Sequence, residues 1–295
     1  MRIFLTGATG FLGRAFCQAA VSRGHELLAL RRDAYGQDTE QLRWAQGHLG
    51  EIPWRSIEGF HPEAALHLAW IATPGVYLQS PENDVLVEQS TALFRGLAAQ
   101  GVAHISGVGT CIEYASSDGP LDEALSPIEP TSAYARAKVK TSQSLRTLAE
   151  AHGRAWSWLR VFYPYGEGEH AGRLPSMLMR LAASDGILAL KTPDSVKDFI
   201  HVADAAMAML MVLEHRVSGP VNVGTGEGVR LQDLAMEVAR IAGIDCTRVQ
   251  PDTQPALDPY PTVIANASRL RQTGWKPTVS LKEGLERLWH SLRNE

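Results

Sequence analysis

The stretch RIFLTGATGFLG, residues 2–13, joins a short apolar run to three glycines and decides the fold expected for this chain. The apolar run at 2–6 predicts a buried strand, and a helical pattern at 11–22 follows the glycines. Glycine adopts tight turn conformations easily and lets a pyrophosphate approach the backbone, while a helix N-terminus offers free N–H groups to phosphate. The stretch therefore predicts a dinucleotide-binding turn rather than an ordinary glycine-rich turn. The expected contacts are Gly7, Thr9, Gly10, Phe11, Leu12 and Gly13.

Beyond this stretch, short apolar runs alternate with segments of helical period. Strands are expected at 2–6, 26–30, 64–69, 103–107 and 156–162, and helices at 11–22, 83–100 and 133–152. Such alternation is typical of right-handed crossovers and of a parallel sheet covered on both faces. We therefore expect an α/β fold with a doubly wound parallel sheet.

The regular alternation ends near residue 162, and the proline-containing segment 251–261 is not expected to be regular. We expect a dinucleotide-binding domain at 1–162, to which 196–223 returns with strands near 198–202 and 220–223. A smaller, loop-rich C-terminal lobe would comprise 163–195 and 224–295. The ligand is expected between the two parts.

Composition limits the kind of partner. The chain has 295 residues, 45% of them hydrophobic, and a formal net charge of -4 without a basic stripe, which disfavours nucleic acid and membrane surfaces and favours a small molecule. Three cysteines at unrelated spacings suit reduced thiols, and ten histidines show no ligand spacing, so no metal is expected. Without a signal segment or a long apolar run, we expect a cytoplasmic protein.

The second predicted strand ends in LALRRD, residues 28–33. In dinucleotide-binding folds an acid here favours NAD, because it binds the ribose 2′-hydroxyl, whereas a guanidinium suits a 2′-phosphate. Arg31 and Arg32 occupy this point and predict a preference for NADP(H), with NAD(H) possible. Two solvated arginines, or Asp33 turned inward, would be the alternatives.

The segment SAYARAK, residues 132–138, places a tyrosine four residues before a lysine. In a helix these side chains lie one turn apart on the same face. By default, such a pair is interpreted as two exposed side chains. A functional role for it needs support from the rest of the chain.

With the glycine turn, LHLAW (66–70), SGVGTCIEY (106–114) and SAYARAK in this order, the chain resembles the extended short-chain dehydrogenase/reductases, in particular their NAD(P)-dependent nucleotide-sugar epimerase, dehydratase and ketoreductase group. LRVFYPYG (159–166), VKDFIHVADAA (196–206), VNVGTGEGVRLQDL (221–234) and TGWKPTVSLKEGL (273–285) extend the resemblance almost end to end. It implies a Rossmann fold. It also implies cofactor contacts from Leu68, Ala69, Tyr134, Lys138 and Tyr163.

The resemblance assigns catalysis to Tyr134, Lys138 and Thr110, the last counted back four residues from Tyr114; Ser106 is a rival still within the strand. A free tyrosine titrates near ~10, too high for proton exchange at neutral pH. A cation ~4 Å away would supply about 4 kcal/mol at an effective dielectric of about 20, or roughly three pKa units. Lys138 is therefore expected to lower the pKa of Tyr134, and Thr110 to position the sugar oxygen.

The resemblance also bears on the reaction. Dehydratases of this group carry an acidic pair after the threonine, whereas this chain has Cys111 and Ile112, so dehydration is not expected. The arginines favour reduction of a nucleotide-linked 4-keto-6-deoxyhexose by NADP(H). An epimerase, a non-catalytic NADP-binding protein and a reductase of small hydrophobic substrates are the alternatives.

Substrate contacts are expected from Trp70, Cys111 and Lys197. The alternative for Cys111 is a packing role. Lys197 replaces an arginine that often contacts the substrate diphosphate in the family. The helices at 83–100 and 133–150 carry alanine, leucine and valine on more than one face. By resemblance they would pair with a second subunit as the four-helix bundle of a homodimer.

Overall fold

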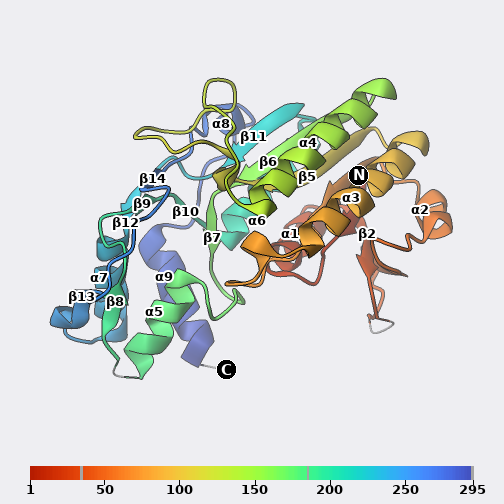
Figure 1. The fold of residues 1–295 in the computed structure, drawn as a ribbon. Helices are drawn as coiled ribbons and strands as arrows, with labels where there is room; N and C mark the ends of the chain where they lie inside the picture. Colours follow the sequence, from red (N-terminus) through yellow and green to blue (C-terminus); the bar gives the residue numbers. More distant parts are fainter. Residues whose placement is uncertain (34–35, 185, 294–295) are drawn as a thin grey trace.

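A computed structural model, which describes residues 1–33, 36–184 and 186–293, has a seven-stranded sheet at its centre (Figure 1). The strand order is β11-β6-β5-β4-β1-β2-β3, and every neighbouring pair is parallel. The strands are β1 (Arg2–Thr6), β2 (Glu26–Arg31), β3 (Leu42–Gln46), β4 (Ala64–His67), β5 (His104–Thr110), β6 (Ala155–Val161) and β11 (Gly219–Val223). This confirms the predicted doubly wound α/β fold.

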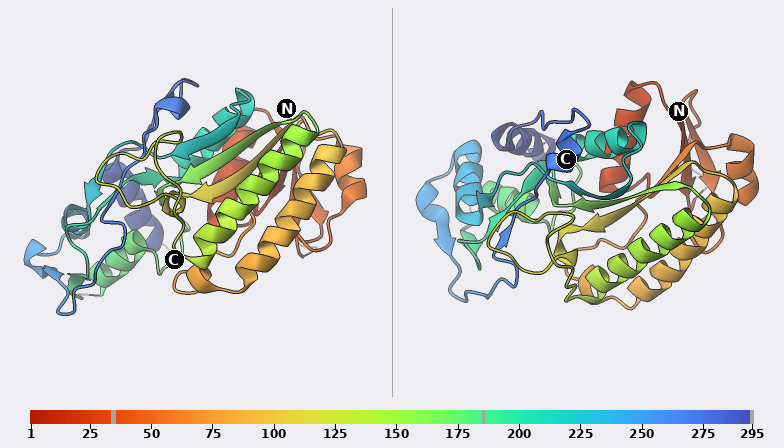
Figure 2. Two further views of the ribbon diagram at one scale, coloured as in Figure 1. Left: turned by 45° about the horizontal axis from the view of Figure 1, so that its top comes forward. Right: turned by 90° about the horizontal axis from the view of Figure 1, so that it is seen from above.

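Helices cover both faces of this sheet, and each face has its own core (Figure 2). On one face α1 (Phe11–Ser22) packs beside α6 (Val202–Glu214), and the short α8 (Ser268–Arg271) contributes Leu270. On the other face α2 (Trp54–Phe60), α3 (Glu82–Ala99) and α4 (Ala133–Ala151) pack over the sheet, with α3 and α4 side by side. The layers bring the carboxyl ends of the parallel strands to one edge, where ligands bind in folds of this kind.

The sequence missed β3, which completes the edge of the sheet beside β2. Its residues LRWAQ are exposed or half-buried except for Ala45, so no continuous apolar run marks them. A strand at the edge of a sheet needs less apolar surface than a central strand, which explains the missing signal.

A second group of elements packs beyond the carboxyl end of the sheet. Helices α5 (Leu174–Ala183), α7 (Leu231–Ala242) and α9 (Leu281–Arg293) share an apolar core that includes Leu178, Leu234 and Leu285. Its small sheets pair β8 (Leu188–Leu190) with β13 (Val249–Pro251), and place β9 (Val196–Lys197) between β12 (Val229–Arg230) and β14 (Thr262–Val263). Within the described residues, no helix is both long and apolar enough to cross a membrane.

One strand expected in the large sheet lies elsewhere. The segment near 198–202 forms β10 (Phe199–His201), which pairs only with β7 (Tyr163–Tyr165) in a separate two-stranded sheet. The prediction was wrong because β11 pairs along β6 and occupies that edge of the large sheet. The expectation for 220–223 is confirmed by β11.

Within the residues that the structure describes, three short 3₁₀ helices connect these elements: η1 (Tyr77–Gln79), η2 (Cys111–Glu113) and η3 (Cys246–Arg248). The first follows β4 and the second follows β5 directly. Both therefore lie where the carboxyl ends of the central strands meet.

Candidate active site

The glycine turn after β1 is packed so closely that side chains are excluded at two positions. Gly7 has a φ of +75°, and a Cβ atom there would lie 2.7 Å from the amide nitrogen of Ala69. A Cβ on Gly13 would lie 2.1 Å from the carbonyl oxygen of Gly7. The turn thus lies backbone to backbone against the end of β4 and the start of α1, as a close approach to pyrophosphate requires.

A cavity of about 670 Å³, here called the glycine-loop cavity, opens beside this turn. Seven of the residues predicted to bind cofactor line it: Gly7, Thr9, Gly10, Arg31, Arg32, Leu68 and Ala69. Phe11 and Gly13 are not among its lining residues. Gly10 precedes α1 without a side-chain cap, so the helix presents uncapped N–H groups here. The room, the bare glycine backbone and the helix end fit a dinucleotide.

The two arginines at the end of β2 differ in their surroundings. The Arg31 guanidinium lies 4.9 Å from the ring centre of Trp44, and its Nε donates to the Asp33 carboxylate. This hydrogen bond with Arg31 holds the pKa of Asp33 below its usual value. Arg32 is exposed. Asp33 therefore turns toward Arg31, and Arg32 keeps its charge toward solvent and the cavity.

A second cavity of about 500 Å³, the central cavity, adjoins the first. Leu68 and Trp70 line both, so the two spaces meet at the end of β4. The structure brings all three predicted catalytic residues to the central cavity. Its lining includes Leu12, Trp70, Thr110, Cys111, Tyr134, Lys138 and Tyr163. Tyr163 therefore lies on this side of the cleft, away from the glycine turn.

Tyr134 is held at the first turn of α4. The hydroxyl of Ser132 caps this helix by accepting the amide N–H of Ala135 at 3.1 Å. The Tyr134 ring meets the edge of Tyr77 at 4.8 Å between centroids and that of Trp70 at 6.4 Å. The tyrosine is thus half-buried against two aromatic rings at the N-terminal end of α4.

Lys138 lies one turn further along α4 and is 3% exposed. Its Nζ donates to the carbonyl oxygen of Val108 at 2.8 Å and lies 3.8 Å from the ring centre of Trp70. Within the part of the chain that the structure describes, no carboxylate forms an ion pair with it. Burial lowers the pKa of Lys138 from 10.5 to about 7, although Glu113 opposes the shift.

The lowered pKa predicted for Tyr134 is wrong for this structure. The pKa of Tyr134 is raised, first by burial and then by nearby Tyr77 and Glu113. The Lys138 ammonium lies 5.7 Å from the centre of the Tyr134 ring and points toward Val108 and Trp70. The expectation failed because it assigned both groups an intermediate dielectric, whereas the dense surroundings penalise each charged form. Tyr134 is therefore protonated at rest.

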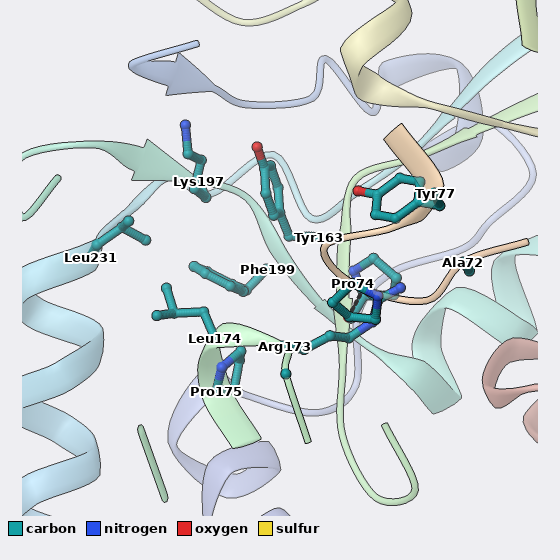
Figure 3. A pocket seen from close by; sticks show the side chains of 12 residues that line it. Ala72, Pro74, Tyr77, Tyr163, Arg173, Leu174, Pro175, Lys197, Phe199 and Leu231 are labelled. Atoms are coloured by element: carbon teal, nitrogen blue, oxygen red, sulfur yellow. Dashed lines mark hydrogen bonds between the residues drawn. The ribbon is translucent and has the colours of Figure 1, made fainter. Parts of the chain in front are cut away.

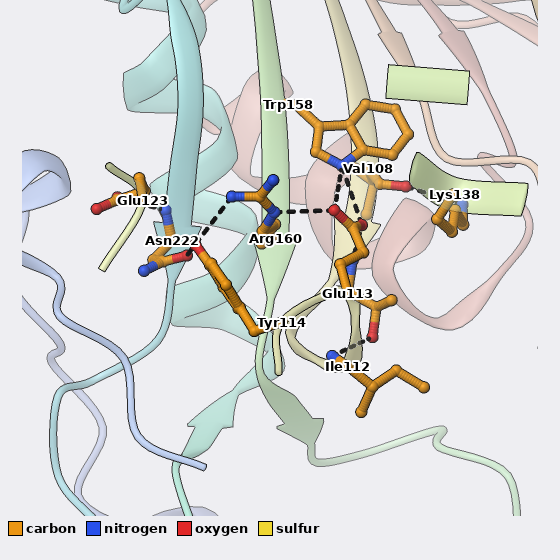
Figure 4. Close-up of polar contacts among 10 residues, drawn as sticks. Val108, Ile112, Glu113, Tyr114, Glu123, Lys138, Trp158, Arg160 and Asn222 are labelled. Carbon is orange, nitrogen blue, oxygen red and sulfur yellow. Dashed lines mark hydrogen bonds and ion pairs between the residues drawn. The ribbon is translucent and has the colours of Figure 1, made fainter. Parts of the chain in front are cut away.

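A buried network around Glu113 and Arg160 holds the end of β5, where Thr110 lies (Figure 4). The Thr110 hydroxyl accepts the amide N–H of Ile112 at 3.4 Å, and its own amide donates to Glu113 at 2.8 Å, which closes η2. Glu113 is fully buried and pairs with Arg160 at 2.8 Å. A buried charge requires such a partner.

The network continues across the sheet. Arg160 on β6 donates to the hydroxyl of Tyr114 at 2.9 Å, and Tyr114 donates to Asn222 on β11 at 2.7 Å. Trp158 donates to both oxygens of Glu113 at 3.0 Å. The turn that carries Thr110 is therefore fixed by side chains from two strands, β6 and β11.

Two other candidates, Ser106 and Cys111, have mainly structural surroundings, and so does His67. Ser106 is fully buried against Ser157 and His104 and does not line the central cavity, whereas Thr110 does. Cys111 lines the cavity too, but burial raises the pKa of its thiol to about 12. His67 bonds Thr6 and Ser90 at 2.7 and 2.8 Å beneath the site.

A third space of about 240 Å³, the outer cavity, continues toward α5 and β10 (Figure 3). Lys197 lines it, but its ammonium donates to Asp258 at 2.7 Å and to the carbonyl oxygen of Tyr260. Arg173 lines both the outer and the central cavity and reaches toward Tyr77. Among the described residues, no carboxylate pairs with Arg173. The sequence missed Arg173 and Tyr77, because neither belongs to a periodic segment or a motif.

Comparison with known proteins agrees with this geometry. The model of the NAD dependent epimerase/dehydratase family matches residues 3–224. The chain is 27% identical to dTDP-4-dehydro-6-deoxyglucose reductase of Escherichia coli, over 99% of this chain and 97% of that protein. It is 28% identical to probable GDP-L-fucose synthase 1 of Oryza sativa subsp. japonica, over 96% and 89%.

An epimerase is also among the similar proteins. UDP-glucose 4-epimerase of Corynebacterium glutamicum is 25% identical over 98% of this chain and 95% of its own. The crystal structure of Thermus thermophilus UDP-glucose 4-epimerase in complex with NAD matches with a TM-score of 0.86, at 23% identity and 99% coverage of both chains, which shows the shared fold. The chain thus belongs to the NAD dependent epimerase/dehydratase family, and it is an NAD(P)-dependent enzyme of the extended short-chain dehydrogenase/reductase type.

Proposed function

We propose that this protein reduces a nucleotide-linked 4-keto-6-deoxyhexose with NADPH. The observation that carries the proposal is the convergence of Thr110, Tyr134 and Lys138 on one cavity that meets the glycine-loop cavity at Leu68 and Trp70. A sugar carbonyl held in the central cavity would thus lie between a proton donor and the dinucleotide pocket. The similarity to a dTDP-4-dehydro-6-deoxyglucose reductase supports this substrate class.

Each side chain has a distinct task in this proposal. The bound dinucleotide would supply the hydride. Tyr134 donates its phenolic proton to the carbonyl oxygen as the carbonyl carbon accepts that hydride, which leaves an alcohol and a tyrosinate. Thr110 donates a hydrogen bond that holds the same oxygen in place. Charged Lys138 stabilises the tyrosinate until a proton returns from solvent.

The state of Tyr134 favours reduction over epimerisation. Epimerisation begins by removing a proton from a sugar hydroxyl, which needs a base, whereas reduction needs an acid. Burial raises the pKa of Tyr134, so its resting form is the acid. Epimerisation remains the second candidate because the chain is also similar to UDP-glucose 4-epimerases.

The preference for NADPH rests on Arg31 and Arg32, which both line the glycine-loop cavity. Arg32 carries more of the expected discrimination, since Asp33 already accepts a hydrogen bond from Arg31. We expect Arg32→Ala to weaken NADPH binding about tenfold and NADH binding hardly at all, because a charge-assisted phosphate contact is lost. Titration of wild type and variant with both cofactors tests this, and wild-type enzyme that binds NADH more tightly would overturn the preference.

The reaction is tested by incubating the protein with NADPH and dTDP-, GDP- or CDP-linked 4-keto-6-deoxyhexoses. Loss of nicotinamide absorbance together with a new deoxyhexose supports reduction. Interconversion of UDP-sugars without that loss would make the protein an epimerase. Tight cofactor binding without turnover on any substrate would indicate a non-catalytic NADP-binding protein.

The homodimer remains a proposal, and it now rests on the charged rather than the apolar side chains of α3 and α4. The buried side of α3 and α4 takes most of their apolar side chains, such as Leu93, Leu97 and Leu145. Their exposed positions are largely charged, acidic early in α3 (Glu82, Asp84, Glu88) and basic along α4 (Arg136, Lys140, Arg146). A two-fold axis would allow the acidic row of one subunit to meet the basic row of the other. Light scattering at low and high salt tests this arrangement.

A further inference from the structure

We infer that Trp70 is a positioning residue that holds the Lys138 ammonium in place and in its charged form at the junction of the glycine-loop and central cavities. The inference rests on the proposed function, in which Lys138 stabilises the tyrosinate of Tyr134. Trp70 lines both cavities, and its ring centre lies 3.8 Å from the Lys138 Nζ. That distance is well within the range in which an indole face attracts a cation.

The indole is itself fixed. Its Nε1–H donates to the side-chain oxygen of Asn83 at 2.9 Å, and Asn83 is 1% exposed. The amide of Asn83 donates in turn to the carbonyl oxygens of Tyr77 and Ser80 at 2.8 and 2.9 Å. The ring that faces the ammonium therefore cannot rotate without breaking a hydrogen bond to a buried group, which costs more than an exposed contact would.

Little else around Lys138 favours its charge. Glu113 acts from η2 but pairs with Arg160, and Tyr134 faces the ammonium at 5.7 Å with a protonated hydroxyl. His67 lies below, with a pKa that burial and then Lys138 lower to about 3, so it is neutral. Among the described residues, the carbonyl of Val108 and the indole face are thus the two contacts that directly stabilise the ammonium. With the pKa of Lys138 near 7, a modest attraction decides its charge at neutral pH.

The test compares Trp70→Leu, which keeps apolar bulk but removes the π face, with Trp70→Phe, which keeps a smaller one. The pKa of Lys138 is measured by NMR on protein labelled with carbon-13 at the lysine ε-carbon. The chain has only six lysines, and the Lys138→Met spectrum assigns the signal. We expect Trp70→Leu to lower this pKa by about one unit and Trp70→Phe by about half as much. Trp289→Leu, on α9 and away from the three cavities, is the control and should leave it unchanged.

Turnover gives a second measurement. Because the charged form is required, kcat/KM falls as pH rises through the pKa of Lys138, so the alkaline limb of Trp70→Leu should move to lower pH by the same amount. A Trp70→Leu protein that is folded by circular dichroism and titrates like wild type overturns the inference. So does tighter NADPH binding with an unchanged titration, since Trp70 would then only obstruct the pocket. If wild-type protein reduces no substrate, the proposed function fails, while the titration still decides the role of Trp70.

Discussion

Two lysines line adjoining cavities of the cleft and are almost equally buried, at 3% exposed for Lys138 and 5% for Lys197, yet their surroundings are opposite. Lys197 has a carboxylate, Asp258, at 2.7 Å and a backbone carbonyl as partners. Lys138 has a carbonyl and an aromatic ring. The charge of Lys197 is therefore neutralised within the protein, whereas that of Lys138 is available to a reacting group.

This difference teaches that burial alone does not mark a functional lysine. A buried ion pair serves packing, and its removal is felt mainly in stability. A buried cation without a carboxylate is costly to maintain and tends to occur where chemistry needs it. Substitutions around Lys138 should therefore change mainly the turnover rate. Substitutions around Lys197 should change mainly the stability of the C-terminal lobe.

The largest expected contrast is between Tyr134, which lies near Lys138, and Tyr163, which lies near Lys197. Tyr134→Phe should reduce kcat about 1000-fold, since it removes the proton donor, and should leave NADPH affinity close to wild type. Tyr163→Phe, whose ring lies 5.7 Å from the Lys197 ammonium, should change kcat less than about tenfold. Steady-state rates with the nucleotide-sugar substrate compare the two. Equal losses would remove the distinction between the regions.

The lysines themselves come next. Lys138→Met should lower kcat/KM about 100-fold, because a cation within several ångströms of the tyrosinate is lost. Lys197→Met should leave kcat within a few-fold and lower the melting temperature, because Asp258 loses its partner. Kinetics and thermal unfolding of both variants, measured side by side, check this. A turnover defect in Lys197→Met as deep as that of Lys138→Met would contradict it.

A smaller effect is expected in the pH dependence of stability. Between about 7 and 10.5 the unfolded chain binds a proton at Lys138 that the folded chain lacks. Raising the pH in this window therefore favours the folded state at this site, by at most about 1.4 kcal/mol per pH unit. Urea unfolding of wild type and Lys138→Met at several pH values isolates the contribution as a difference. A pH-independent difference would mean that the pKa of Lys138 is not lowered.

The smallest effect is expected for Arg173, a further cation of the cleft. Since Asp258 holds Lys197, the anionic part of the substrate should bind Arg173, which lines both the central and the outer cavity. Arg173→Met should raise KM for the nucleotide sugar about tenfold and leave kcat nearly unchanged. Arg180→Met, on the exposed side of α5, is a matched control for the loss of a guanidinium. An unchanged KM would return the role to Lys197.

Much of this arrangement could be predicted because it follows from spacing. Gly7 and Gly13 stand where backbone must meet backbone, and Tyr134 and Lys138 are one helical turn apart. Parallel strands place their carboxyl ends together, so motifs after β1, β4, β5 and β6 meet at one edge. These relations depend on local geometry, which short stretches of sequence encode.

The rest depends on distant partners. The sequence around Lys197 does not predict its contact with Asp258, 61 residues away. The sequence around Arg173 likewise does not predict that it lacks a carboxylate partner among the described residues. The direction of the Tyr134 pKa was predicted wrongly because spacing gives proximity but not the density of the surroundings. The strand β10 was misplaced because its apolar residues suit a small sheet as well as a large one.

The network that fixes Thr110 is completed only late in the synthesis of the chain. Tyr114 and its acceptor Asn222 are separated by 108 residues, so the ribosome makes the threonine turn long before the strand that completes its support. Until then the Tyr114 hydroxyl lacks its acceptor, whereas Glu113 already has its partners Arg160 and Trp158. A nascent chain that ends before β11 therefore carries all three proposed catalytic side chains but lacks the hydrogen bond that ties the threonine turn to the edge strand of the sheet.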